Sequence, residues 1–222
     1  MKFQLAINMA MTLDGKVARP DGKWYGLSSR QDKRQMDKIR SQADALILGK
    51  NSLINDDPVI KLRYVEGKDP LPVILLRKGI VSKNRKVFSN PNIRPLVICL
   101  KENEFSVKAE LSGVAEILVL EGNTIEPKEI LSILKNRNLS RVLLEGGPTL
   151  NYSFQKAGLI DVINLTIVPF LIGKKNLPSI VDGEFEFPNF AEDKWNLTHC
   201  EKIDNEVFLR YEKEILTDTP VE

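Results

Sequence analysis

The sequence has one histidine and two cysteines among its 222 residues. His199 precedes Cys200 directly, whereas Cys99 lies far away in the sequence. A Ser-His-Asp hydrolase or a histidine-based metal site needs a nucleophile or further ligands at suitable spacing, and none accompanies His199. The sequence therefore argues against both kinds of site. The two cysteines are expected to be reduced thiols.

Long apolar runs and an excess of one charge are also absent. No run approaches the roughly 18 apolar residues of a membrane-spanning helix. The first residues, MKFQLAINMAMTLDG, show no small-residue cleavage pattern, so we interpret them as a strand and not as a signal peptide. With 32 basic and 30 acidic residues, the net charge of +2 predicts neither a nucleic-acid nor a membrane partner. We expect a cytoplasmic protein.

Short apolar segments alternate with helical patterns along most of the chain. The predicted strands are 3–11, 45–48, 73–76, 96–100, 115–120 and 141–144, and the predicted helices are 30–42, 127–137 and 149–157. This alternation is typical of an α/β domain, with a mostly parallel sheet and helices on both faces. After Asp161 the period changes: 162–168 alternates, and 195–200 with 206–214 predicts an antiparallel carboxyl-terminal hairpin.

A glycine turn joins the last of these parallel strands to its helix, in the stretch RVLLEGGPTLNY at 141–152. Gly146 and Gly147 have no Cβ, so a ligand can approach the backbone closely. The N-terminus of the following helix offers unpaired N–H groups, which suit a phosphate. Glu145 would point into the same cleft. The motif is short, so an anion site and an ordinary tight turn both remain compatible with it.

Other polar residues lie in or after the predicted strands. Asn8 interrupts a buried strand and needs a partner, which is either the backbone or a ligand. Arg77 and Lys78 follow the third strand, where they could hold the 2′-phosphate of NADP or form a solvated turn. Asp56 and Asp57 have no third carboxylate or histidine nearby, so we predict no metal site. A ribose hydroxyl or a backbone amide is the expected partner of these carboxylates.

Five motifs, taken in order, resemble the pyrimidine reductases of riboflavin biosynthesis, which have a dihydrofolate-reductase-like fold. They are MTLDGK at 11–16, IRSQADALILG at 39–49, NDDP at 55–58, LLEGGPTL at 143–150 and AGLID at 157–161. The resemblance covers residues 1 to about 185. It implies a single reductase domain over 1–222. The H-x-E and P-C-x-x-C motifs of the zinc deaminase that precedes many bacterial relatives are not in the sequence.

The resemblance implies an NADPH-dependent oxidoreductase. Family members reduce the ribosyl group of a 5-amino-6-(ribosylamino)pyrimidine 5′-phosphate to ribityl, with hydride transfer to C1′ of the open imine. The resemblance leaves open whether the pyrimidine still carries its 2-amino group. Family members are usually homodimers, so a homodimer is expected here.

The resemblance also implies site residues. Expected cofactor contacts, with Arg77 added from its position after the third strand, are Ser52, Asp56, Arg77, Gly146, Gly147, Pro148, Thr149, Leu150 and Asn151. Expected substrate contacts are Asn8, Gly26, Ser28, Arg40, Ile60, Arg63 and Glu145. From its position in the last turn of the predicted helix alone, Arg40 would be a solvated cation. The resemblance instead implies that Arg40 and Arg63 clamp the 5′-phosphate, which suits the guanidinium fork.

The proton donor and two other functions stay open. Water is one candidate donor and Asp14 is the other. A pterin or dihydrofolate reductase on the same fold would need a carboxylate on the first long helix, where Asp32 and Asp37 are available. A nucleotide-binding relative without catalysis is the third interpretation. For residues 184–196 the sequence gives no role.

Overall fold

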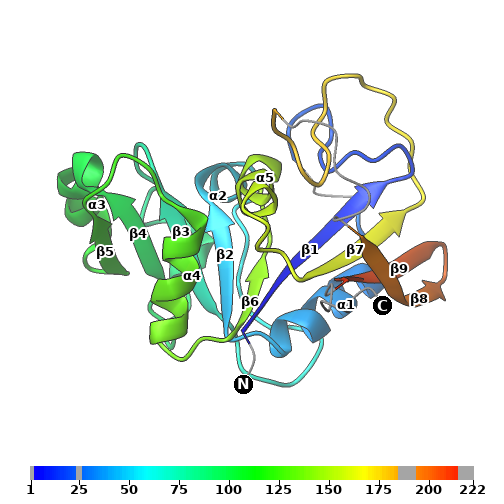
Figure 1. Ribbon diagram of the computed structural model, residues 1–222, viewed down its shortest axis with the longest axis horizontal. Coiled ribbons are helices and arrows are strands. Elements are labelled where there is room, and N and C mark those ends of the chain that lie inside the picture. Colours follow the sequence, from blue (N-terminus) through cyan, green and yellow to red (C-terminus); the bar gives the residue numbers. More distant parts are fainter. Residues whose placement is uncertain (1–2, 24–26, 185–193, 215–222) are drawn as a thin grey trace, which may run out of the picture.

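A computed structural model describes residues 3–23, 27–184 and 194–214, which form a nine-stranded sheet in the order β5-β4-β3-β2-β6-β1-β7-β9-β8 (Figure 1). The strands are β1 Gln4–Thr12, β2 Ala45–Gly49, β3 Leu71–Leu76, β4 Leu96–Leu100, β5 Glu116–Leu120, β6 Arg141–Leu144, β7 Val162–Val168, β8 Trp195–Ile203 and β9 Glu206–Lys213. All pairs from β5 to β7 are parallel, and β7-β9-β8 are antiparallel.

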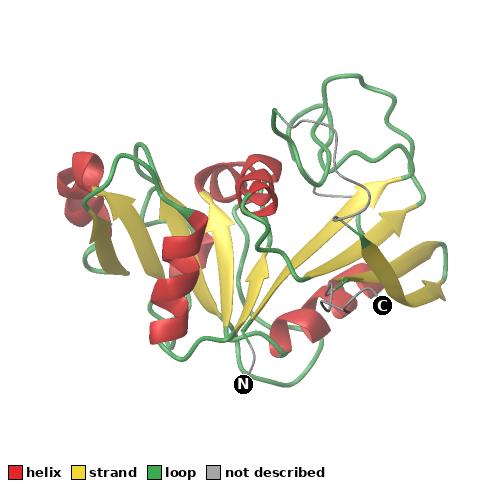
Figure 2. Cartoon of the chain, viewed as in Figure 1, coloured by secondary structure: helices red, strands yellow, loops and turns green. Residues whose placement is uncertain are grey.

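Helices cover both faces of the sheet (Figure 2). They are α1 Arg30–Ser41, α2 Lys50–Asp56, α3 Glu104–Leu111, α4 Pro127–Asn136 and α5 Pro148–Lys156. Side chains alternate between the faces of a strand, so Ile7 packs with α4 and α5 whereas Ala6 packs with α1, α2 and α3. The predicted α/β fold, with its antiparallel carboxyl-terminal strands, is confirmed.

Most predicted elements are present, and the differences have local causes. The sequence did not predict α3, because Phe105 is 86% exposed and only Val107 and Leu111 face the core, which leaves a weak apolar pattern. Asn51 and Ser52, which are of residue types that often cap helices, lie inside α2. That helix begins at Lys50, after Gly49, without a side-chain cap.

Helix α1 contacts the sheet through charged residues. Met36, Ile39 and Ala43 lie at the spacing of an apolar face, and Ile39 and Ala43 pack against the core, but all three remain partly exposed. The helix residues that are buried are instead Asp32, Asp37 and Arg40, with exposed fractions of 8%, 0% and 4%. Removing charges from water is unfavourable unless each charge finds partners. The position of α1 therefore depends on polar contacts.

Asp37 makes one of these contacts with the segment between α2 and β3. Its Oδ2 accepts hydrogen bonds from the backbone N–H groups of Arg63 at 2.7 Å and Tyr64 at 3.0 Å. Its Oδ1 has no hydrogen-bond partner among the described residues. The carboxylate thus fixes the main chain at Arg63 relative to α1.

We expect Asp37→Ala to lower the free energy of unfolding by about 2–4 kcal/mol, because two partly buried amides lose their charged acceptor at roughly 1–2 kcal/mol each. Urea unfolding followed by circular dichroism measures this change. The control is Lys38→Ala, on the exposed side of the same helix, which should stay within about 0.5 kcal/mol of wild type. Equal stabilities of the two variants would contradict the anchoring role of Asp37.

Candidate functional site

The glycine turn lies at the carboxyl ends of β6 and β2. Gly146 has a φ of 85°, and its carbonyl accepts a hydrogen bond from the Gly49 N–H at 2.9 Å. The Gly146–Gly147 peptide is cis. Gly147 is the N-cap of α5 and Pro148 follows it, with no side chain capping the helix. Pro148 has no N–H, and the N–H groups of Leu150 and Asn151 donate to the Gly147 carbonyl at 2.9 and 3.0 Å. Among the described residues, the Thr149 N–H makes no hydrogen bond and is the group of this first turn that an anion can use.

Neighbouring elements pack closely around this turn. A Cβ on Gly146 would lie 3.4 Å from the Met9 sulfur, and one on Gly147 would lie 3.6 Å from the Ser52 hydroxyl. A Cβ on Gly49 would lie 3.6 Å from the Gly146 carbonyl. The structure thus brings Ser52 beside the segment Gly146–Asn151, which contains most of the expected cofactor contacts.

Asn151 has a structural contact in addition to its expected role. Its side chain is fully buried, and its Nδ2 donates to the Ile180 carbonyl at 2.7 Å. The Asp182 N–H donates to the Pro148 carbonyl at 3.2 Å. These two bonds hold the segment around residue 181 against the first turn of α5.

The Arg77 turn follows β3 at the same edge of the sheet. Gly49 and Leu75 are register partners in the parallel pair β2-β3, so Arg77 follows at the carboxyl edge. Asn103 holds the turn, because its Nδ2 donates to the Leu76 carbonyl at 3.1 Å and the Gly79 carbonyl at 2.9 Å. The Arg77 side chain is exposed.

The neighbouring residues Asp56 and Asp57 differ in their backbone conformation and exposure. Asp56 is the last residue of α2 and is exposed. Asp57 has a φ of 44°, so it lies outside the right-handed helical region, as the following Pro58 predicts. Its conformation is left-handed and not extended. Its Oδ1 accepts from the Lys86 backbone N–H at 3.0 Å. For Asp57, the predicted backbone-amide partner is confirmed.

Glu145, Arg40 and Asn8 form the polar centre of the site. Glu145 follows β6 directly, and its carboxylate accepts from Arg40 Nε at 3.0 Å and Nη2 at 2.5 Å. Asn8 Nδ2 donates to Glu145 Oε1 at 3.2 Å. The Arg40 and Glu145 side chains are 5% and 9% exposed. The solvated arginine that the helix pattern alone suggested is therefore wrong.

Arg40 stays charged despite its burial. Burial opposes the charge, but the carboxylate of Glu145, with Asp37 and Asp32 nearby, outweighs that effect and raises the pKa of Arg40. Two of its three guanidinium nitrogens are engaged by Glu145, which leaves Nη1 for another partner.

Arg63 and Ile60 lie in the segment that Asp37 anchors. The Arg63 side chain is exposed, with its guanidinium carbon 5.6 Å from the centre of the Tyr64 ring. Arg30 lies 5.8 Å from the centre of the same ring. Ile60 is only 3% exposed and packs in the core. Of the two expected phosphate-binding arginines, Arg63 is therefore the accessible one.

Ser28 lies at the other end of α1, beside Asp32. Burial is the largest influence on the pKa of Asp32 and raises it to about 6. The negative charge of Glu206 also raises this pKa, whereas hydrogen bonds with Thr166 and Ser28 lower it. The Ser29 hydroxyl donates to Glu206 at 2.6 Å. Sequence reasoning missed Thr166 and Glu206, since no local pattern connects them with α1. Gly26 lies outside the described residues.

Asp14 belongs to the turn after β1. It accepts hydrogen bonds from the Thr12 hydroxyl at 2.6 Å and from the Gly173 N–H at 2.8 Å. These bonds, with that of Thr12 the largest influence, lower its pKa to about 2. Asp14 is thus ionised at neutral pH, and this geometry favours a structural role over proton delivery.

Metal-binding groups and membrane spans were sought over the described ranges. There, no group of three or more His, Cys, Asp or Glu side chains could hold a metal ion. No helix in those ranges is long and apolar enough to cross a membrane. Cys99 is buried and Cys200 exposed, and both are free thiols.

Known proteins resemble this chain in sequence. It is 31% identical over 188 residues to the 2,5-diamino-6-ribosylamino-4(3H)-pyrimidinone 5′-phosphate reductase of Methanothermobacter thermautotrophicus, which covers 83% of this chain and 86% of that protein. It is 33% identical over 171 residues to the riboflavin biosynthesis protein RibD of Aquifex aeolicus. That match covers 77% of this chain but 47% of the relative, so the chain spans about half of that longer protein.

Solved structures show the same fold. A deaminase and 5-amino-6-(5-phosphoribosylamino)uracil reductase of Thermotoga maritima superimposes with a TM-score of 0.78 at 24% identity, over 96% of this chain and 57% of that one. A pyrimidine reductase-like protein of Corynebacterium diphtheriae gives 0.79 at 18% identity, over 96% and 92%. The family model for the RibD C-terminal domain matches residues 4–209. With a match over most of its length, this chain belongs to the RibD C-terminal domain family.

Proposed function

We propose that this protein uses NADPH to reduce the ribosyl group of a 5-amino-6-(ribosylamino)pyrimidine 5′-phosphate to ribityl, in riboflavin biosynthesis. The observation that supports this most is the buried Glu145–Arg40 pair with Asn8, directly beside the glycine turn. The named reductase among its relatives acts on a substrate of this class. The proposal covers reduction alone and assigns no deaminase step to this chain.

The residues at the carboxyl edge of the sheet fit NADPH. The uncapped N-terminus of α5 would bind the pyrophosphate through the Thr149 N–H, and Ser52 lies beside it. Arg77 would pair with the 2′-phosphate that distinguishes NADPH from NADH. The exposed Asp56 at the end of α2 would accept a hydrogen bond from a ribose hydroxyl. Bound NADPH would supply the hydride.

The substrate would lie between this edge and α1. Arg63 is accessible to the 5′-phosphate, and Arg40 can add its remaining nitrogen, Nη1. Glu145 can accept hydrogen bonds from sugar hydroxyls beside its hydrogen bonds with Arg40. Hydride addition to C1′ of the open imine requires a proton on the imine nitrogen. With Asp14 held ionised, we assign this proton to water.

One observation favours a second function, the reduction of a pterin. Asp32 is a buried carboxylate on α1 with a pKa raised to about 6, first of all by burial, and with Thr166 and Ser28 as partners. A carboxylate in such a place can bind the adjacent N–H and amino groups of a pterin. A pterin without a phosphate group would give the exposed Arg63 side chain no anion to bind. We therefore place the pyrimidine reductase first.

The decisive assay follows the loss of NADPH absorbance with three substrates offered separately. They are the 2-amino and 2-oxo forms of the ribosylaminopyrimidine 5′-phosphate, and dihydrofolate. We expect turnover of one or both pyrimidines and none of dihydrofolate. Turnover of dihydrofolate alone would support the pterin reductase. NADPH binding without turnover of any substrate would support the nucleotide-binding relative.

We expect Arg63→Ala to raise the KM for the phosphorylated pyrimidine by about 10- to 100-fold, because a charge-assisted hydrogen bond contributes roughly 1.5–3 kcal/mol. The KM for NADPH should stay within about twofold of wild type. Lys61→Ala is the matched control, since Lys61 is an exposed cation two positions earlier. A loss of NADPH binding in Arg63→Ala would remove Arg63 from the substrate site.

Arg77→Ala should weaken NADPH by about 10-fold or more and leave the affinity for NADH unchanged, because only NADPH carries the 2′-phosphate. Fluorescence titration with the two nucleotides measures both affinities. Lys83→Ala, another exposed cation, serves as the control. Equal weakening of both nucleotides would show that Arg77 does not read the 2′-phosphate.

A further inference from the structure

A row of polar residues runs across the sheet under α1. The register pairs Asn8 with Asn164, Asn164 with Arg210 and Arg210 with His199, on the successive strands β1, β7, β9 and β8. Directly paired residues project to the same face of a sheet. For this row it is the α1 face, since Ala6 and Val162, two positions before Asn8 and Asn164, pack with Ile39 of α1.

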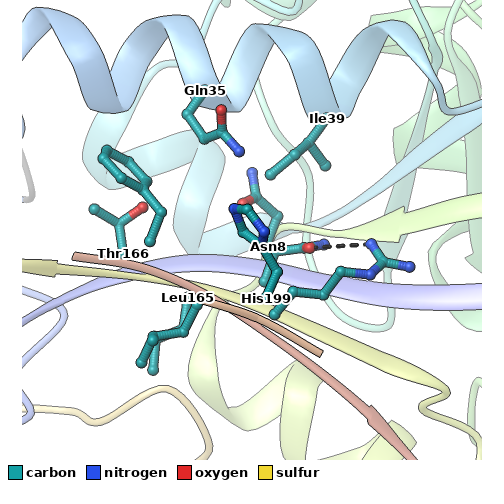
Figure 3. A pocket seen from close by; sticks show the side chains of 10 residues that line it. Asn8, Gln35, Ile39, Leu165, Thr166 and His199 are labelled. Atoms are coloured by element: carbon teal, nitrogen blue, oxygen red, sulfur yellow. Dashed lines mark hydrogen bonds between the residues drawn. The ribbon is translucent and has the colours of Figure 1, made fainter. Parts of the chain in front are cut away.

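Hydrogen bonds connect the row to the polar centre of the site. Arg210 Nη1 donates to Asn164 Oδ1 at 3.2 Å, the bond drawn as a dashed line in Figure 3. Asn164 Nδ2 donates to the Ile7 carbonyl at 3.4 Å. Asn8 in turn donates to Glu145 at 3.2 Å. The row thus begins at Glu145 and reaches the strands at the sheet edge.

A cavity lies between the row and the helix. Gln35 and Ile39 extend from α1 toward Asn8 and His199, with Thr166 beside them (Figure 3). Its volume of about 60 Å³ exceeds the roughly 10–15 Å³ that a single water molecule requires. The phosphate of the substrate is assigned to the accessible Arg63, so the cavity is left for another part of the molecule.

The cavity offers the groups that a carbonyl-bearing pyrimidine needs. Arg210 uses Nε for Glu212 at 2.8 Å and Nη1 for Asn164, so within the described residues its Nη2 makes no hydrogen bond. Asn8 uses one amide hydrogen for Glu145, which leaves its carbonyl oxygen as an acceptor. Ile39 and Phe208 supply apolar contact for the ring. One donor, one acceptor and apolar walls converge here.

We propose that this cavity is the subsite for the ring of the aminopyrimidine, with Arg210 donating to a ring carbonyl and Asn164 holding the guanidinium in place. The proposal rests on the proposed function and extends it, since it assigns the ring to β7 and β9. Asn164 is a positioning residue in this scheme. The 34% exposed Arg210 side chain is replaceable without opening the core.

The test compares Arg210→Met with Arg210→Lys and with Lys202→Met, a control at an exposed residue of β8. Arg210→Met should raise the KM for the preferred pyrimidine about 10-fold or more, through loss of a charge-assisted hydrogen bond. Arg210→Lys should recover part of this loss, and Lys202→Met should match wild type. The KM for NADPH and the melting temperature should not change.

Two fragment inhibitors separate ring binding from a general disturbance of the site. Ribose 5-phosphate, which lacks the pyrimidine ring, should inhibit all variants equally. 5,6-Diaminouracil, which has no sugar, should inhibit wild type and Lys202→Met but not Arg210→Met. Weaker inhibition by ribose 5-phosphate in Arg210→Met, or an unchanged KM for the pyrimidine, would overturn the subsite. If wild type reduces neither pyrimidine, the proposed function fails and the subsite fails with it.

Discussion

The ion pair between Arg40 and Glu145 holds together parts of the molecule that are far apart in the sequence. One partner comes from α1 and the other from the end of β6, and both side chains are almost fully buried. A buried pair is weak evidence for stability, because the desolvation of both charges opposes their attraction. Loss of either partner alone would leave the other charge buried and unpaired. The pair lies on the face of α1 that also packs Ile39 against the sheet, and the proposed function gives these two buried charges a role in binding.

Two halves of the candidate site meet at neighbouring residues of the chain. Gly146, whose φ of 85° favours glycine, opens the half that would bind phosphate under the proposed function. Glu145, one residue earlier, belongs to the half built for polar hydroxyl and amide groups. Under the proposed function, a cofactor bound at the glycine turn and a sugar bound at Glu145 would be adjacent, because Gly146 and Glu145 are neighbours at one strand end. Hydride transfer needs this adjacency more than any single catalytic group.

The sequence predicted the strands well because their apolar runs depend on local pattern alone. Segments 96–100, 141–144 and 162–168 match the observed strands residue for residue. On α1 the apolar spacing correctly indicated that Ile39 packs against the sheet, but it did not reveal that Asp32, Asp37 and Arg40 are buried. The partners that bury Arg40 and Asp32 are Glu145 and Thr166, more than a hundred residues later. No local period can reveal such pairs, whereas the family motifs did indicate that Arg40 and Glu145 belong to one site.

The polar character of α1 also explains how a cavity persists in a close-packed domain. Interiors usually fill such spaces, because every unfilled contact forfeits dispersion energy. A helix with leucines in place of Asp32, Gln35 and Arg40 would pack onto β1 and β7 and close the space above Asn8 and Asn164. The charged face of α1 does not pack in this way, so polar side chains of the helix lie across the cavity from the polar row. The loss of packing at α1 thus leaves a polar cavity, which we have proposed as the subsite for a planar, hydrogen-bonding ring.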